Sequence, residues 1–500
     1  MPDVIVIGSG LGGLSAAVSL AAKGLGVTVV EAAPNFGGKA NIVTLDGVEC
    51  DTGPSVLTLP DTLDAVLREA GTSLAAEVTL LTHTPAFRYV TAKGDVLELM
   101  PTLPETLANV SKTLGEAAAR ELATFMADAA EVWELSKIAF VYGEAPSVRS
   151  LWELGPAKMA GFGRVDPFRS MWAAICNKVK HPLLRVILAR YATYNGSDPR
   201  SAPATLNCIA HVEIGLGGYG VRGGVYELVR ALVRVAERQG VRLRASSPVE
   251  SLTVERGRAV GVTLRGGEAL RASAIVCNAD VAHLHEHLLP KAQRRVVAAP
   301  ETPSMSGWTG LVRARRRVGQ DARAAHTVLF PEDYLEEFAD IFDRDRPPQA
   351  PTVYCCAQEP CHQRRGWADH EPVFIMTNAP PEPRVGARPA EVTNALRERA
   401  LGRLREAGLI DQDDAVVWER APSGLAAAYP GSRGALYGAS SNSLFAAFKR
   451  PANRVSGLPG LYLASGSAHP GGGMPLCVLS GRMAARHVLA DLGEKTQAAK

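Results

Sequence analysis

The chain has 500 residues, of which 46% are hydrophobic and 21% charged, which excludes a largely disordered protein and predicts two or three structural units. Lys and Arg number 54 and Asp and Glu 51, giving a net charge of +3, so the chain has no long-range field for gathering nucleic acid. Eight cysteines without a framework spacing predict reduced thiols and a cytoplasmic location. Glycine is abundant at 48 residues, and the positions of the glycines point to a function.

The N-terminal segment is typical of a turn that binds the phosphates of a dinucleotide. Val4–Ile7 is an apolar, β-branched run, which predicts a buried parallel strand. A G-x-G-x-x-G pattern follows, then a helical pattern and a second strand that ends in an acidic residue. Such glycines permit a tight turn, approach of the backbone to a pyrophosphate and helix–strand packing, and such an acid accepts hydrogen bonds from a ribose. The predicted cofactor residues here are Gly8, Gly10, Gly12, Gly13 and Glu31.

A second glycine pair and a D-x-G-P segment follow, at 37–39 and 51–54. With the first fingerprint they resemble the flavin amine oxidase and phytoene desaturase superfamily, in which a Gly-Gly-Arg or Gly-Gly-Lys follows the ribose acid. The resemblance implies FAD as the cofactor, whereas two ordinary turns in an NAD enzyme are the alternative. The residues that it adds to the cofactor site are Gly38, Lys39, Gly53 and Pro54.

Two later segments are expected to return to the same cofactor. A helical stripe over 223–240 precedes predicted strands at 241–243, 248–252, 259–264 and 274–277. A strand at 460–464 precedes a glycine-rich loop and a C-terminal helix, so backbone N–H groups would again converge on an anion or on the flavin. By resemblance, these segments contribute Val249, Asn278, Gly466, Gly473, Met474 and Pro475.

The predicted fold is therefore α/β. A Rossmann-like FAD-binding domain is assembled from the discontinuous segments 1–70, 221–295 and 455–500. The interrupting segments 71–220 and 296–454 form an α+β substrate domain that faces a membrane, as in the amine oxidase and phytoene desaturase architecture.

Over essentially its whole length the chain resembles the carotenoid desaturases. Residues 191–203 resemble their Y-x-x-Y-x-G-x-x-P-x-x-x-P segment, and residues 430–438, 446–451 and 474–482 resemble the hydroxycarotenoid 3,4-desaturase branch, the methoxyneurosporene or hydroxyneurosporene dehydrogenases. The resemblance implies FAD-dependent introduction of the 3,4 double bond into an acyclic 1-hydroxycarotenoid. The alternatives are a phytoene desaturase, a carotenoid isomerase or saturase, an amine-oxidase-like enzyme on a soluble substrate, and a non-catalytic lipid carrier.

The sequence identifies no catalytic residue. Desaturation removes two hydrogens from adjacent carbons, with the flavin as electron sink, but no base for the departing proton is evident. His469, beside the C-terminal glycine loop, is a candidate for which a structural role is the favoured interpretation.

A polyene dissolves in lipid, so we expect a peripheral membrane protein, with other enzymes of carotenoid synthesis as further candidate partners. No run reaches the ~18 apolar residues of a membrane span. One helical face combines apolar residues with nearby basic ones, which fits either an interfacial helix or a helix packed in the substrate domain. The apolar members are Phe168, Met171, Trp172, Ile175 and Val179.

No metal site is predicted. His283, His285 and His287 alternate without an acidic or cysteine partner, and Cys355, Cys356, Cys361 and His362 lack the spacing of a zinc site. The basic run 313–317 is interpreted as an exposed strand edge.

Overall fold

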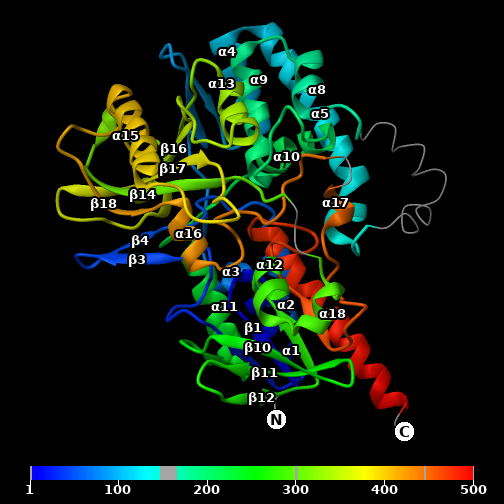
Figure 1. Cartoon of the computed structure of the whole chain (residues 1–500). Coiled ribbons are helices and arrows are strands. Elements are labelled where there is room, and N and C mark those ends of the chain that lie inside the picture. The colour runs from blue at the N-terminus through cyan, green and yellow to red at the C-terminus, as the bar shows by residue number, and fades with distance from the viewer. Residues whose placement is uncertain (1–2, 147–165, 299–301, 444–445, 499–500) are drawn as a thin grey trace.

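The structure is a computed structural model that describes residues 3–146, 166–298, 302–443 and 446–498 (Figure 1). Its first layer is a parallel sheet of five strands in the order β19-β13-β1-β2-β9. These strands are short and mostly fully buried, which is why their sequences are apolar throughout. Their bounds are β1 Val4–Ile7, β2 Val27–Val30, β9 Arg242–Arg244, β13 Ala274–Cys277 and β19 Leu461–Leu463.

Helices cover one face of this sheet and a small antiparallel sheet covers the other. Val4 and Val6 pack against α1 (Leu11–Ala21), α11 (Tyr226–Arg238) and α18 (Met474–Ala498). Ile5 and Ile7 point the other way, because side chains alternate along a strand, and pack against β10 (Val249–Glu255) and β11 (Arg258–Leu264). Strand β12 (Ala269–Arg271) completes the three-stranded sheet. The predicted α/β fold is confirmed by this arrangement.

A second, larger sheet lies on the other side of the molecule (Figure 1), with seven strands in the order β18-β14-β17-β16-β15-β6-β7. Helix α15 (Ala390–Glu406) packs on one face through Leu396, Ala400 and Leu404. The other face packs against α4 (Leu103–Leu114), α5 (Glu116–Lys137), α8 (Met171–Lys178) and α9 (Pro182–Ala189). The strands are β6 Phe87–Val90, β7 Val96–Leu99, β14 Ser306–Arg315, β15 His326–Leu329, β16 Val353–Ala357, β17 His370–Ala379 and β18 Ala415–Arg420.

Shorter elements connect the two layers. The pairs β3 (Ile42–Leu45) with β4 (Val48–Asp51) and β5 (Leu80–Leu81) with β8 (Gly220–Val221) are two-stranded sheets. The remaining α-helices are α2 Asp61–Glu69, α3 Leu74–Glu77, α10 Cys208–Ala210, α12 Val281–His283, α13 Tyr334–Phe338, α14 Gln358–His362, α16 Pro422–Ala428 and α17 Ala446–Lys449. The domain boundaries given above stay a prediction.

The apolar stripe considered for a membrane-surface helix lies inside the protein. Met171, Ile175 and Val179 are each 0% exposed and belong to the core under the seven-stranded sheet. Trp172 packs against the same core, whereas Phe168 precedes α8 and is 86% exposed. The interfacial interpretation of this stripe is wrong, because the helix has a protein core to bury its apolar face against.

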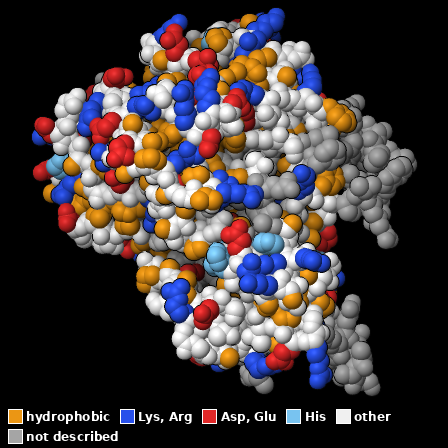
Figure 2. Space-filling view, in the orientation of Figure 1, with side chains coloured by type: hydrophobic (Ala, Val, Ile, Leu, Met, Phe, Trp, Pro, Cys, Tyr) orange, Lys and Arg blue, Asp and Glu red, His pale blue; other side chains and the backbone are white. Residues whose placement is uncertain are grey.

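The basic run at 313–317 does not lie at a sheet edge. Its first residues belong to β14, which pairs with β17 on one side and with β18 on the other. Arg313 extends over the ring of Trp367, 4.8 Å from the ring centroid, and pairs with Asp46. The predicted edge strand is therefore an internal one. On the face shown in Figure 2, basic and acidic side chains are interspersed, in keeping with the near balance of 54 and 51.

Candidate cofactor and substrate site

The first glycine loop presents unpaired backbone donors at the end of β1. Gly8 turns the chain with a φ of +88°, a conformation that glycine adopts without strain. Gly10 is the N-cap of α1 and brings no side-chain acceptor to the first turn, so the N–H groups there lack an intrahelical partner. With the positive end of the helix dipole, these donors fit a pyrophosphate.

Gly12 and Gly13 are required by packing. A Cβ on Gly12 would lie 2.2 Å from the carbonyl oxygen of Ala464, and one on Gly13 would lie 2.1 Å from that of Gly8. Gly481 of α18 approaches just as closely, since its Cβ would lie 2.1 Å from the carbonyl oxygen of Gly12. These contacts hold α1 against α18 and so fix the direction of the α1 N-terminus.

Glu31 is anchored between two of the predicted cofactor segments. Its carboxylate accepts hydrogen bonds from Ser9 N (2.8 Å), Ser9 Oγ (2.6 Å) and Ala33 N (2.9 Å). Its backbone N–H donates to Arg244 O, and Ser247 N–H donates to its carbonyl oxygen. Val249 lies two residues further on, at the start of β10, so it starts close to the acid that is predicted to bind the ribose.

The second glycine pair and the D-x-G-P segment pack onto the first loop. A Cβ on Gly38 would lie 3.2 Å from Gly10 Cα, and one on Gly53 would lie 2.3 Å from the carbonyl oxygen of Lys39. The ammonium of Lys39 donates to the carbonyl oxygens of Ala435 (2.8 Å) and Leu436 (3.0 Å). Burial lowers the pKa of Lys39, an effect opposed by Asp280.

The C-terminal glycine loop closes the same site. Asn278 follows β13, and its Nδ2 donates to the carbonyl oxygen of Ala464. A Cβ on Gly466 would lie 3.1 Å from Cys477 Sγ and 3.3 Å from Gly472 Cα. Gly473, with a φ of +108°, faces open space. The structure thus brings together at one edge of the sheet the segments that carry the predicted residues, as parallel-sheet cofactor sites require.

A cavity of about 570 Å³ lies between this edge and the seven-stranded sheet. The predicted cofactor loops contribute Gly53, Pro54, Gly473, Met474 and Pro475 to its wall. The opposite wall is largely apolar and comes from β15–β17, α5 and the segments around it. Its apolar side chains include Phe87, Trp133, Phe140, Val328, Phe374 and Met376. The volume falls in the range of small-molecule sites.

A buried polar cluster interrupts the apolar wall. Arg190 and Tyr194 line the cavity, and both contact Glu213, which is 6% exposed. Burial raises the pKa of Tyr194 well above its ordinary value. Sequence reasoning quoted Tyr194 within a motif but missed Arg190 and Glu213. An arginine between Leu188-Ala189 and Tyr191-Ala192, in an otherwise apolar stretch, was the available signal.

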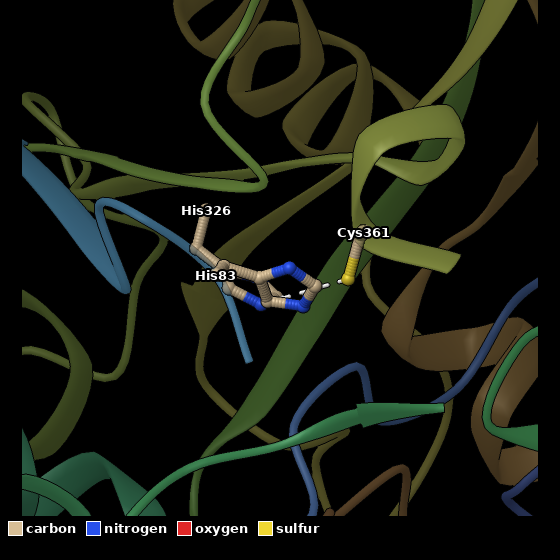
Figure 3. A group of neighbouring side chains, drawn as sticks. All are labelled: His83, His326 and Cys361. Atoms are coloured by element: carbon tan, nitrogen blue, oxygen red, sulfur yellow. Dashed lines mark hydrogen bonds between the residues drawn. The ribbon is translucent and has the colours of Figure 1, made fainter. Parts of the chain in front are cut away.

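A second buried group lies behind the wall. The Tyr354 hydroxyl, on the cavity surface, is 2.8 Å from His326 Nδ1, and His326 Nε2 is 3.6 Å from Cys361 Sγ. Figure 3 shows His83 beside His326, with Cys361 facing the imidazole. Burial lowers the pKa of His326 well below its ordinary value and raises that of Cys361 well above its own, which favours neutral side chains.

The ligand atoms of His83, His326 and Cys361 lie within 4.8 Å of one another, as do those of Cys356, Cys361 and His362. The sequence considered the cysteines with His362 and missed His83 and His326, which come from distant segments that meet only in the fold. That the protein uses no metal stays a prediction.

His469 joins two loops. It is 2% exposed, and its Nε2 is 2.9 Å from the carbonyl oxygen of Gly143. Burial lowers the pKa of His469, which favours a neutral imidazole that donates to Gly143. This contact supports the structural role expected of it.

The glycine loops at the carboxyl ends of parallel strands, with a cavity beside them, define an oxidoreductase that binds a dinucleotide. The chain belongs to the flavin-containing amine oxidoreductase family, whose model matches residues 11–333, and its cofactor is FAD. The donors at the α1 N-terminus and the open space at Gly473 fit this cofactor. The resemblance to this superfamily is confirmed.

The chain is similar to carotenoid-modifying enzymes over its whole length. It is 35% identical to the hydroxyneurosporene desaturase of Rubrivivax gelatinosus, covering 98% of this chain and 93% of that one. It is 29% identical to the 1-hydroxycarotenoid 3,4-desaturase of Flavobacterium sp., with 100% of both chains covered. In fold it is similar to an oxidoreductase from Methanosarcina mazei, with a TM-score of 0.64 at 16% identity over 96% of this chain and 98% of that one.

Proposed function

We propose that the protein desaturates an acyclic carotenoid and introduces the 3,4 double bond into a 1-hydroxycarotenoid. The observation that carries this proposal is the cavity, which has glycine loops of the FAD site on one wall and apolar side chains on the other. The names of the two relatives support the same reaction class.

The lining of the cavity disfavours a soluble amine as substrate. None of the described residues that line it is an aspartate or glutamate, whereas a site for an organic cation needs a negative charge or an aromatic cage. The glycine loops, with their donors and close backbone contacts, disfavour a non-catalytic lipid carrier, since such a carrier has no need of a pyrophosphate site.

FAD, when bound, supplies the acceptor for the hydride that leaves the substrate. The chain itself would hold the pyrophosphate at Gly8 and Gly10, the ribose at Glu31 and the flavin end near Gly53 and Gly473. Phe374 and Met376 would orient the polyene and exclude water from the reacting bond. The Tyr354–His326 pair holds a hydroxyl at the cavity wall by a 2.8 Å hydrogen bond.

We also propose that the protein works at a membrane surface in the cytoplasm, where its substrate and other enzymes of carotenoid synthesis are found. Among the described residues, none of the helices combines the length and apolar character that crossing a bilayer requires. Ile138 and Phe168 are 52% and 86% exposed, and each lies within two residues of a cavity-lining residue, Phe140 and Pro167. These exposed apolar side chains would seat the cavity against lipid.

The test is incubation of the purified holoprotein with vesicles that carry phytoene, neurosporene or 1-hydroxyneurosporene. We expect new conjugation with 1-hydroxyneurosporene, detected as a product with a longer-wavelength absorption spectrum. New conjugation with phytoene alone would assign the protein to the phytoene desaturases, and none with any substrate would refute the proposal.

A cofactor variant provides the control. Glu31→Arg replaces a carboxylate that accepts three hydrogen bonds beside the glycine loop with a cation that cannot accept one. We expect it to lose flavin and all activity. A Glu31→Arg protein that keeps its full flavin content would contradict the assignment of the ribose site.

A further inference from the structure

We propose that Arg190, Tyr194 and Glu213 form a subsite that binds the hydroxyl group of the substrate and so selects hydroxylated over hydrocarbon polyenes. The inference rests on the proposed function and adds to it the residues that determine specificity. It starts from a polar cluster at a wall that is otherwise suited to a hydrocarbon.

The cluster is a buried ion pair surrounded by tyrosine hydroxyls. Arg190 begins the 3-10 helix Arg190–Asn195 and Glu213 lies in the turn His211–Gly215. Arg190 Nη2 donates to Glu213 Oε1 (3.4 Å) and to Tyr89 Oη (2.9 Å). The Tyr194 hydroxyl donates to Glu213 Oε2. At 7% and 6% exposed, both charges are far from bulk water, so their hydrogen bonds are hard to replace.

The guanidinium keeps unused donors in this setting. Its hydrogen bonds leave through Nη2, and its Nε is buried with no hydrogen-bond partner among the described residues. The guanidinium also lies 5.1 Å to 5.4 Å from the centroids of four aromatic rings, which stabilise its charge but accept no conventional hydrogen bond. Since buried donors are rarely left unpaired, the cluster has capacity for an oxygen from the cavity that Arg190 lines.

The subsite lies next to the predicted flavin end of the cofactor. A Cβ on Gly218 would lie 3.4 Å from Glu213 Cγ and 3.0 Å from Val56 Cγ1, and Val56 is two residues after Pro54. Tyr437 connects the other side, because it lies 2.9 Å from a Cβ on Gly196, in the loop after Arg190–Asn195, and 2.8 Å from one on Gly472. The cluster therefore borders the part of the cavity where both glycine loops meet.

This location agrees with the chemistry of the proposed substrate. In a 1-hydroxycarotenoid three bonds of about 1.5 Å separate the oxygen from the nearer reacting carbon, so the two lie within about 5 Å. A subsite for the hydroxyl must then border the flavin end of the cavity. A hydroxyl both donates and accepts, so it can donate to Glu213 and accept from Arg190. A hydrocarbon end would leave these groups unpaired, which predicts a preference of roughly 10- to 100-fold.

Two tyrosines make a matched pair of variants. Tyr194→Phe removes a hydroxyl that contacts Glu213 at the cavity wall. Tyr191→Phe removes one that donates to the same carboxylate at 2.8 Å from a ring that is 0% exposed and does not line the cavity. If the cluster only anchors the fold, the two variants should behave alike. Arg190→Lys, which keeps the charge but loses the planar fork of donors, gives a third measurement.

The test measures kcat/KM for 1-hydroxyneurosporene and for neurosporene, with flavin content and Tm recorded for each variant. We expect the wild type to prefer the hydroxylated substrate, Tyr194→Phe and Arg190→Lys to lower that preference about tenfold, mainly through KM, and Tyr191→Phe to keep it. A wild type that turns over both substrates equally, or variants that lose both activities in parallel, would overturn the subsite. A wild type that turns over neither refutes the proposed function itself.

Discussion

Single buried carboxyl groups make the stability of this protein depend on pH. Glu337 is 1% exposed and accepts hydrogen bonds from Thr352 Oγ1 and Asn378 Nδ2. Burial raises the pKa of Glu337 from 4.5 to about 7. Between these values a rise in pH ionises the unfolded chain before it ionises the folded one. The free energy of unfolding therefore falls across this range.

Glu337→Gln removes this dependence, because an amide stays neutral. Each tenfold change in proton affinity is worth about 1.4 kcal/mol, so relative to wild type the variant should gain on the order of 3 kcal/mol from pH 4.5 to pH 7. Urea unfolding at several pH values measures the difference. Glu336→Gln is the control, since Glu336 is exposed and its ion pair with Arg344 contributes little. Parallel pH profiles for wild type and Glu337→Gln would contradict the raised pKa.

Residue roles could be predicted from sequence where they depend on local backbone geometry. The strand–glycine–helix order around Gly8 and Gly10 predicted a turn with unpaired donors, which the structure contains. The partners of Arg190 and His326 could not be predicted in this way. They come from segments as far apart as Tyr89 and Glu213, or Tyr354 and Cys361, which meet only after the seven-stranded sheet has formed.

At the scale of elements, the crossing of α1 and α18 sets the geometry of the cofactor site. Gly481→Ala would place a Cβ 2.1 Å from the carbonyl oxygen of Gly12 and force the helices apart. We expect a loss of about 1–3 kcal/mol in stability and weaker FAD binding, measured by thermal unfolding and flavin release.

Gly493→Ala, in the same helix, is the matched control. Nothing lies within 4 Å of a Cβ at that position, and alanine is the better helix former, so this variant should be neutral or more stable by about 0.5–1 kcal/mol. If Gly481→Ala were equally well tolerated, the close crossing would not be what orients α1.

Elements were predictable from their apolar periodicity, but the surroundings of each element were not. The pattern at Met171, Ile175 and Val179 correctly indicated a helix with one apolar face. It did not say whether lipid or protein covers that face, and the structure covers it with protein. In the same way, the alternation around Arg313 indicated a strand, but its two neighbours in the sheet come from residues more than 50 positions away.

At the scale of the whole molecule, the proposed membrane surface is the side with exposed apolar residues next to the cavity. The double variant Ile138→Ser with Phe168→Ser should lower partition onto phospholipid vesicles at least about tenfold, because it removes two apolar side chains from the interface. Co-sedimentation with vesicles measures this. Val385→Ser is the control, as Val385 is 89% exposed in the loop before α15. An equal loss in both variants, or none in either, would reject this orientation.

The central claim is that this chain couples its FAD to the desaturation of a carotenoid. The most direct measurement is a single turnover without oxygen or any added acceptor, in which holoprotein is mixed with 1-hydroxyneurosporene in vesicles. Loss of the oxidised flavin absorbance and formation of the lengthened polyene should proceed together, with one new double bond for each flavin. A polyene that changes while the flavin stays oxidised would instead indicate an isomerase and would contradict the account.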